Sequence, residues 1–249
     1  MYNDIANLYH LVYPNWNEAI EKQGNALNGL IRTFVGSAPV SILDVSCGIG
    51  TQALGLAPFG HNVTASDLSV AAVERARSEA VTRGLNITFK VADMRKCFET
   101  HGSGFDVVLS ADNSLPHLPG EEDIRVALQG FHDCLKKDGV AFVNLRDYLE
   151  DEDRSSPQMW PYGFRYNGSE RYFVFQTRDW SNNSYEVAMY FVREVGEGVP
   201  ACITAGLSRY YAITIDNLMS LFKDVGFTDV QRLDGILHQP IVVGRRSTL

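Results

Sequence analysis

The sequence predicts an α/β fold in which helices cover both faces of a mostly parallel sheet. Short apolar runs alternate with segments of helical periodicity over residues 15–145, and a glycine-rich turn directly follows the first apolar run. Strands that alternate with helices at this spacing pair in parallel, because each helix carries the chain back to the start of the next strand. After residue 150 the pattern changes to neighbouring strands, which indicates an antiparallel insertion.

The first half of the chain alternates regularly between helix and strand. Apolar residues at helical spacing predict a helix over residues 15–35, which ends near Gly36. Ser69 is a typical N-cap and Gly84 a typical helix stop, so the segment between them predicts another helix. The other expected elements are strands at 40–45, 62–65, 87–91, 105–110 and 140–145 and helices at 51–57 and 121–135.

The second half of the chain contains the insertion. The acidic run 150–153 predicts an exposed connection, and the polar turn 181–184 joins expected strands at 172–180 and 185–193 into a hairpin. The remaining elements are a strand at 207–213, a helix from Thr214 or Asp216 to Val225, and strands at 227–233 and 241–244.

The insertion is too small to form an independent domain, because roughly 60 residues of hairpin bury little surface by themselves. We therefore expect one domain over residues 1–249. Its parts would be an N-terminal helical cap (1–37), a core (38–150 and 207–249) and an antiparallel lid (151–206).

The composition limits the classes of function. The chain is 45% apolar and 21% charged, as in ordinary globular proteins, and its net charge of −8 argues against a general binder of nucleic-acid phosphates. Its four cysteines are far apart, which predicts neither disulfides nor a metal centre. No secretory leader and no bilayer-spanning apolar run is visible. We expect a cytoplasmic protein that binds a small molecule and neither nucleic acid nor membranes. A homo-oligomer is compatible with the sequence.

The most informative segment is the turn after the first expected strand, Asp44-Val45-Ser46-Cys47-Gly48-Ile49-Gly50-Thr51. Glycines between a buried strand and a helix let the backbone pass close to a ligand. The run from Gly48 to Ala53 also satisfies the dinucleotide pattern G-x-G-x-x-A. The glycines alone therefore leave the identity of the cofactor open.

Three carboxylates decide between the cofactors. Asp44 precedes Gly48 by four residues, where it would repel a pyrophosphate and attract the ammonium group of an aminoacyl moiety. Asp67 ends the second strand and can accept hydrogen bonds from both ribose hydroxyls, a role that serves an amino-acid cofactor and a dinucleotide equally. Asp93 follows the third strand, either as an acceptor for an adenine amino group, with Met94 against the ring, or as a solvated loop residue or helix cap. The set favours an adenosine cofactor with an amino-acid end.

The patterns Asp-x-x-Cys-Gly-x-Gly-Thr, Ala65-Ser66-Asp67 and Ala92-Asp93-Met94 together resemble the class I S-adenosylmethionine (SAM)-dependent methyltransferases over roughly residues 40–150. The resemblance implies a Rossmann-like, seven-stranded sheet with an antiparallel last strand, and SAM as the cofactor. It places the loop from Asp44 to Gly50 at the amino-acid end of SAM, Asp67 at the ribose and residues 92–94 at the adenine. The full set of expected cofactor residues is Tyr2, Asp44, Ser46, Gly48, Gly50, Thr51, Asp67, Leu68, Ala92, Asp93, Met94 and Ala111.

The substrate that accepts the methyl group is expected where the fourth and fifth strands end, since an open α/β sheet places its site at the carboxyl ends of its strands. Asn113 and His117 follow the fourth strand, and Arg146 follows the fifth. A guanidinium beside a cofactor pocket suits a carboxylate, although an ion pair with Asp147 is the alternative. His117 is either a base or a hydrogen-bond partner of the cofactor or backbone, and its position after a proline favours the second role.

The acceptor segments Asn113-Ser114, His117-Leu118 and Arg146-Asp147-Tyr148 are similar to those of the glycine and sarcosine N-methyltransferases. This resemblance implies that Asn113 and Arg146 bind a substrate carboxylate. It also implies that N-terminal tyrosines, here Tyr2 and Tyr13, close the site. The family's usual Arg-Asn-Tyr reads Arg-Asp-Tyr here, and the extra carboxylate suits a cationic amine.

We therefore expect methyl transfer to an amine nitrogen of a small metabolite such as glycine, sarcosine or a related amino acid. The catalytic candidates are Tyr13, Asn113, His117 and Arg146. An O-methyltransferase is the alternative within the same family, and an NAD-dependent oxidoreductase rests only on the ambiguous glycines. The pair Asp112-Asn113 is similar to the acidic pair of metal-dependent catechol O-methyltransferases, but further metal-facing carboxylates and a lysine base are not evident.

Overall fold

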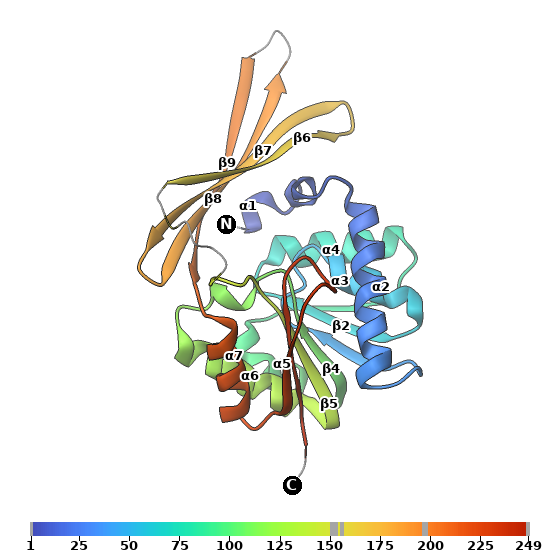
Figure 1. Cartoon of the computed structure of the whole chain (residues 1–249). Coiled ribbons are helices and arrows are strands. Elements are labelled where there is room, and N and C mark those ends of the chain that lie inside the picture. Colours follow the sequence, from blue (N-terminus) through green and yellow to red (C-terminus); the bar gives the residue numbers. More distant parts are fainter. Residues whose placement is uncertain (1, 150–153, 155–156, 196–198, 248–249) are drawn as a thin grey trace.

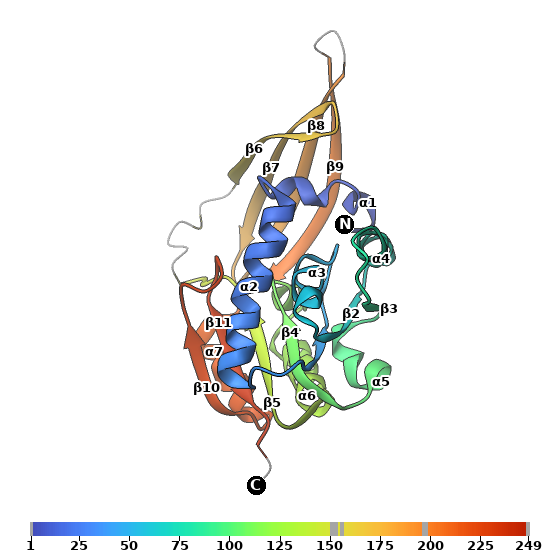
Figure 2. The same ribbon diagram turned by 90° about the vertical axis from the view of Figure 1, so that its right-hand side faces the viewer.

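The computed structural model describes residues 2–149, 154, 157–195 and 199–247. Its strands form two separate sheets (Figures 1 and 2). The strands of the larger sheet are β1 (Ser41–Asp44), β2 (Asn62–Asp67), β3 (Thr88–Val91), β4 (Phe105–Ser110), β5 (Leu135–Asn144), β10 (Thr228–Leu233) and β11 (Ile241–Arg245). Their order across the sheet is β10-β11-β5-β4-β1-β2-β3.

The larger sheet is parallel except at β11. Strand β1 lies at its centre and pairs in parallel with β2 and β4, and β3 and β5 continue the parallel pairing outward. Strand β11 runs antiparallel to both β5 and β10. The expected seven-stranded, mostly parallel sheet with an antiparallel last strand is therefore confirmed. The carboxyl ends of β1 to β5 consequently meet at one edge of the sheet.

Helices cover both faces of this sheet, as the alternating pattern predicts (Figure 1). One face packs against α2 (Trp16–Phe34), α3 (Thr51–Leu56) and α4 (Val70–Thr82). The opposite face packs against α5 (Cys97–His101), α6 (Glu121–Cys134) and α7 (Ile215–Asp224). Neighbouring residues of β1 alternate between the two cores, with Ile42 in the first and Leu43 in the second.

Local sequence explains where the two longest helices of the first face begin. The side chain of Asn15 accepts a hydrogen bond from the amide of Glu18 and caps α2, and Ser69 caps α4 through the amide of Ala72. Each cap satisfies one of the amides that a helix leaves unpaired at its start. None of the helices in the described part of the chain is long and apolar enough to span a membrane.

The smaller sheet is antiparallel and consists of β6 (Gln158–Asn167), β7 (Glu170–Ser181), β8 (Ser184–Val195) and β9 (Val199–Tyr211). The expected hairpin is β7–β8, in which Ser181 pairs with Ser184. Strand β9 pairs with β8 along its length, so the antiparallel sheet continues to Tyr211, and the strand expected at 207–213 is its end. The acidic run 150–153 lies outside the described residues.

The N-terminal segment lies between the two sheets (Figures 1 and 2). It contains α1 (Tyr2–Ile5) and the short 3₁₀ helix η1 (Tyr9–Val12). Ile5 and Leu11 are buried in a third apolar cluster, together with Val174 and Phe191 of the smaller sheet. The smaller sheet therefore rests on the N-terminal segment, and both lie above the edge where the parallel strands end.

Candidate active site

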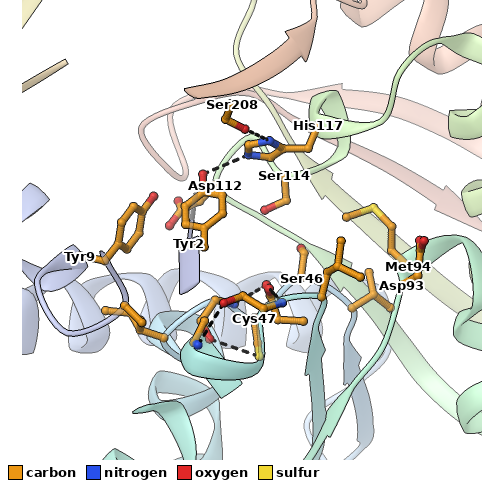
Figure 3. Close-up of a pocket in the computed structure, with 18 of the residues that line it drawn as sticks. Tyr2, Tyr9, Ser46, Cys47, Asp93, Met94, Asp112, Ser114, His117 and Ser208 are labelled. Carbon is orange, nitrogen blue, oxygen red and sulfur yellow. Dashed lines mark hydrogen bonds between the residues drawn. The ribbon is translucent and has the colours of Figure 1, made fainter. Parts of the chain in front are cut away.

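A cavity of about 480 Å³ lies at the carboxyl ends of the parallel strands. Its floor is the β1–α3 loop, one side is formed by the ends of β2 and β3, and its roof comes from the N-terminal segment and β9 (Figure 3). Residues far apart in the sequence thus meet around one space. Its lining includes Tyr2, Tyr9, Tyr13, Ser46, Gly48, Thr51, Gln52, Asp67, Leu68, Ala92, Asp93, Met94, Arg95, Asp112, Ser114, His117, Leu207 and Ser208.

The glycine loop has the backbone conformation that its sequence predicts. Gly48 and Gly50 have φ angles of 52° and 95°, in the left-handed region that side chains disfavour. A Cβ on Gly50 would also lie 3.1 Å from the Cβ of Ala76 on α4. The loop is tied to the N-terminal part of the chain, because Trp16 Nε1 donates to Thr51 Oγ1 at 2.9 Å.

Asp44 lies beneath this loop and is completely buried. The amide of Ser46 donates to its Oδ1 at 3.3 Å, whereas its Oδ2 has no hydrogen-bond partner among the residues described. Burial raises the pKa of this carboxyl to about 8, and the nearby Asp67 and Asp112 add to the rise. A buried carboxylate oxygen without a partner is costly, which is expected where a ligand supplies the missing donor.

Asp67 stands at the end of β2 and holds the loop in place. The amide of Gly48 donates to its Oδ2, and the amide of Ser69 donates to its Oδ1, each at 2.9 Å. Burial raises the pKa of the Asp67 carboxyl, and these two amide hydrogen bonds oppose the rise. Each carboxylate oxygen can accept a further hydrogen bond, so Asp67 can also receive hydroxyl groups of a ligand.

Asp93 and Met94 line the opposite end of the cavity. Asp93 caps the 3₁₀ helix η3 (Met94–Lys96) through the amide of Arg95. It also forms an ion pair with the Arg95 guanidinium, which reaches Asp123 as well. The Arg95 side chain lowers the pKa of Asp93. Asp93 is therefore both a helix cap and a wall of the cavity, and Arg95 is a member of the site that the sequence did not predict.

Tyrosines of the N-terminal segment form the roof. The Tyr2 hydroxyl lies 3.0 Å from His117 Nε2 and 3.1 Å from the hydroxyl of Tyr210 on β9. The ring of Tyr9 packs edge-on against Tyr2. These contacts join the N-terminus, the β4 end and the smaller sheet directly over the cavity.

His117 is held on both sides of its ring. Its Nδ1 lies 2.9 Å from Ser208 Oγ, its Nε2 faces Tyr2, and its ring centroid is 4.0 Å from that of Tyr210. Burial lowers the pKa of His117 to about 4, so the ring is neutral at neutral pH. This environment suits a positioning role between the two layers better than general-base catalysis, because a base works best with a pKa near the operating pH.

Asp112 occupies the turn after β4, and sequence reasoning did not include it among the site residues. Tyr13 donates to its Oδ2 at 2.8 Å, and Gln52 Nε2 donates to the same oxygen at 3.0 Å. The backbone amide of Asp112 is held by Asn144 Oδ1 at 3.0 Å. Its position directly after a strand could have indicated a site residue. The family resemblance, however, points to the neighbouring Asn113.

Asn113 and Arg146 lie behind the cavity rather than in its lining. Asn113 Nδ2 donates to the Tyr148 hydroxyl at 2.9 Å, and its Oδ1 accepts from the amide of Arg146 at 3.0 Å. The Nδ2 group also reaches the Tyr185 hydroxyl of β8 at 3.4 Å. Asn113 thus connects the ends of β4 and β5 to the smaller sheet through both of its amide atoms.

The expected site residues therefore fall into two groups. Lining the cavity are Tyr2, Tyr13, Ser46, Gly48, Thr51, Asp67, Leu68, Ala92, Asp93, Met94 and His117. Behind it lie Asp44, Gly50, Ala111, Asn113 and Arg146. Within the described ranges, no three His, Cys, Asp or Glu side chains gather closely enough to hold a metal ion.

Comparison with known proteins shows which proteins this architecture is similar to. Residues 42–139 match a family model described as a methyltransferase domain. A glycine/sarcosine N-methyltransferase of Aphanothece halophytica is 28% identical over 134 residues, which are 54% of this chain and 49% of that protein. A ubiquinone biosynthesis O-methyltransferase of Nitrosococcus oceani is 33% identical over 122 residues, 47% of this chain and 51% of that protein. The chain thus spans about half the length of these curated relatives.

Solved structures match over nearly the whole chain. Streptomyces venezuelae DesVI superposes with a TM-score of 0.83 at 20% identity, covering 97% of this chain and 98% of that one. SAM-bound CalS10, an amino pentose methyltransferase from Micromonospora echinaspora, has a TM-score of 0.78 at 17% identity, with coverages of 97% and 95%. These matches include the smaller sheet as well as the core. The expected resemblance is confirmed: the chain carries a methyltransferase domain in the fold of the SAM-dependent methyltransferases.

Proposed function

We propose that this protein transfers a methyl group from SAM to an amine nitrogen of a small metabolite. The observation that carries the cofactor assignment is Asp44, whose buried Oδ2 has no partner in the described part of the chain. Asp44 does not line the cavity itself, but it lies directly beneath the lining residues Val45 to Gly48, where an ammonium group from the amino-acid end of SAM would supply this partner. A pyrophosphate at the same place would meet an acidic side chain instead.

The remaining cofactor contacts follow from the positions of the other acids. Asp67 would accept from the ribose hydroxyls while it keeps its two hydrogen bonds to the loop. Asp93 and Met94, at the opposite end of the cavity, would contact the adenine. Ser46, Gly48, Thr51, Leu68 and Ala92 would complete the lining, with Gly50 and Ala111 as support and Tyr2 as the cover.

When bound, SAM supplies a methyl group that its sulfonium already activates. The protein therefore has to orient the acceptor nitrogen in line with the sulfur–methyl bond and to exclude water. Tyr13 and His117 line the cavity and would contact or orient the acceptor, and Asn113 and Arg146 would support them from behind. Solvent is sufficient to take the proton that the amine loses.

Transfer to nitrogen is favoured over transfer to oxygen by two kinds of relative. The curated relatives include glycine/sarcosine N-methyltransferases, and the full-length structural matches include an amino pentose methyltransferase and a sugar N-methyltransferase. Ubiquinone biosynthesis O-methyltransferases match over a similar share of the chain, so a hydroxyl acceptor is the second candidate. A cytoplasmic location and the absence of nucleic-acid binding stay predictions from composition.

Calorimetry of cofactor binding, followed by an assay for the reaction product, tests this function. We expect SAM to bind and NAD to give no heat, because the acidic loop disfavours a pyrophosphate. We then expect release of S-adenosylhomocysteine with at least one compound from a panel of amino acids, amino sugars and simple amines. Binding of NAD without SAM would contradict the cofactor assignment, and turnover only with hydroxyl acceptors would contradict transfer to nitrogen.

A further inference from the structure

Asp112 has a constrained backbone at the end of β4. Its φ angle is 53° and that of Asn113 is 59°, so two consecutive residues other than glycine adopt the left-handed region. Such conformations are unfavourable for residues with a side chain and persist only where surrounding contacts hold them. Here Asn144 Oδ1 fixes the amide of Asp112, and Tyr148 holds the side chain of Asn113. The turn thereby directs Asp112 into the cavity and Asn113 away from it.

One oxygen of the Asp112 carboxylate is already held, and Asp112 lines the cavity. Tyr13 and Gln52 both donate to Oδ2. No side chain in the described part of the chain hydrogen-bonds to Oδ1 or forms an ion pair with Asp112. Asp112 lies across the cavity from Asp93 and Met94 (Figure 3). It is thus oriented by neutral donors at the end away from the expected adenine position.

The charges around the cavity are predominantly negative. Asp67, Asp93 and Asp112 line it, and among the described lining residues Arg95 is the only lysine or arginine. Arg95 is engaged by Asp93 and Asp123. A cavity of one charge sign attracts ligands of the opposite sign and opposes a second anion.

The arginine expected to bind an acceptor carboxylate is placed differently. Arg146 does not line the cavity. Burial raises the pKa values of Tyr148 and Tyr185 behind Asn113, and the positive charge of Arg146 opposes this rise. A carboxylate on the acceptor would therefore meet Asp112 before it could reach Arg146. A neutral or cationic amine would instead find in the Asp112 carboxylate an oxygen that can accept its N–H hydrogen bond.

We propose that Asp112 binds the nitrogen of the methyl acceptor and selects amines that carry no carboxylate group. This inference rests on the proposed function and names the class of its substrate. An N–H of the acceptor donates to Asp112 Oδ1, which leaves the nitrogen lone pair to point along the sulfur–methyl bond. The acceptor class is then an amino alcohol or amino sugar rather than an amino acid.

Asp112 also acts on the transferred charge. As the nitrogen–carbon bond forms and the sulfur–carbon bond breaks, the positive charge moves from sulfur to nitrogen, and sulfur leaves as a neutral thioether. The new alkylammonium later gives a proton to solvent. A carboxylate beside the nitrogen is thus more strongly attracted in the transition state than to the neutral amine.

Ethanolamine and glycine provide a matched pair of probes, since they differ only in a hydroxymethyl group against a carboxylate. We expect the unmodified enzyme to methylate ethanolamine, and glucosamine as a larger probe, with kcat/KM at least about 10-fold above that for glycine. Asp112→Asn keeps the shape and tolerates the left-handed backbone. It should lower kcat/KM for ethanolamine about 30-fold, with a fall in kcat, and leave the Kd for SAM within about 3-fold. Asp224→Asn, in a surface ion pair with Arg125, is the matched control and should change neither value.

The outcomes separate this inference from the proposed function. Methylation of amines with glycine preferred over ethanolamine would overturn the inference and leave the function standing. An Asp112→Asn enzyme that loses SAM affinity while keeping the preference between the probes would show that Asp112 serves the cofactor, and would also overturn it. Turnover of no amine by the unmodified enzyme would overturn the proposed function and this inference together. The comparison of probes uses the unmodified enzyme, so it does not depend on the variant.

Discussion

The two ends of the cavity are built in different ways. The cofactor end consists of short segments at the ends of β1, β2 and β3, where backbone amides and carboxylates lie in a fixed order along the chain. The acceptor end combines the N-terminal segment, the turn after β4 and strand β9, which are up to 208 residues apart at the contact between Tyr2 and Tyr210. The cofactor end therefore depends on local sequence, whereas the acceptor end depends on tertiary packing.

This difference predicts that single substitutions should separate binding of the cofactor from use of the acceptor. A change at the cofactor end should weaken SAM binding for every acceptor. A change at the acceptor end should alter kcat/KM for the acceptor and leave SAM binding nearly unchanged. Three substitutions test the distinction, in order of decreasing expected effect.

Asp67→Ala should have the largest effect. It removes the acceptor for the ribose hydroxyls and also the hydrogen bonds that hold Gly48 and Ser69. We expect the Kd for SAM to rise about 100-fold, because hydrogen bonds to charged groups contribute roughly 1.5–3 kcal/mol each. Calorimetric titration measures this change. An unchanged Kd would show that the cavity does not hold a ribose at β2.

Asn113→Ala should have an intermediate effect confined to the acceptor end. The substitution leaves the Arg146 amide without this partner and leaves the buried Tyr148 hydroxyl with Tyr185 alone. We expect kcat/KM for the acceptor to fall about 10-fold and the free energy of unfolding to fall by about 1–3 kcal/mol. The Kd for SAM should stay within about 2-fold of its original value, and a parallel loss of SAM binding would remove the distinction between the two ends.

Tyr13→Phe should have the smallest effect. It removes one of the two donors that orient Asp112 Oδ2 and keeps the ring that lines the cavity. We expect a rise of about 3-fold in KM for the amine acceptor, as for the loss of one exposed hydrogen bond. Steady-state kinetics at saturating SAM measures it. A change in kcat of about 100-fold or more would instead assign the Tyr13 hydroxyl a direct part in the chemistry.

The sequence predicted the cofactor end well for a physical reason. Strand periodicity fixes which residues end each parallel strand, and Asp44, Asp67 and Asp93 all occupy such ends. Caps such as Ser69 are local signals as well, since their partners lie three residues away. The alternation of strands and helices also predicts the parallel pairing of this sheet, whereas its seven strands and antiparallel last strand are what the family resemblance implies.

The acceptor end was predicted less completely because its geometry is not local. The left-handed turn at Asp112 and Asn113 decides which of the two side chains enters the cavity, and strand alternation does not extend into such a turn. Strand β6 was also missed. It is a partly exposed edge strand with Pro161 and a bulge near Gly163, and both features break the pattern that identifies a strand.

We infer that the buried carboxyl of Asp44 receives the ammonium group of SAM. The proton that this carboxyl carries in the free protein provides the most direct test. Burial raises the Asp44 pKa to about 8, so the free protein holds a proton there at pH 7. Pairing with an ammonium favours the carboxylate, so binding should release up to about one proton and should strengthen as the pH rises toward 8. SAM titrations at pH 7 in two buffers with different ionisation enthalpies measure this release. We expect proton release that disappears in Asp44→Asn, whereas SAM binding without proton release in the unmodified protein would show that Asp44 does not receive the ammonium group.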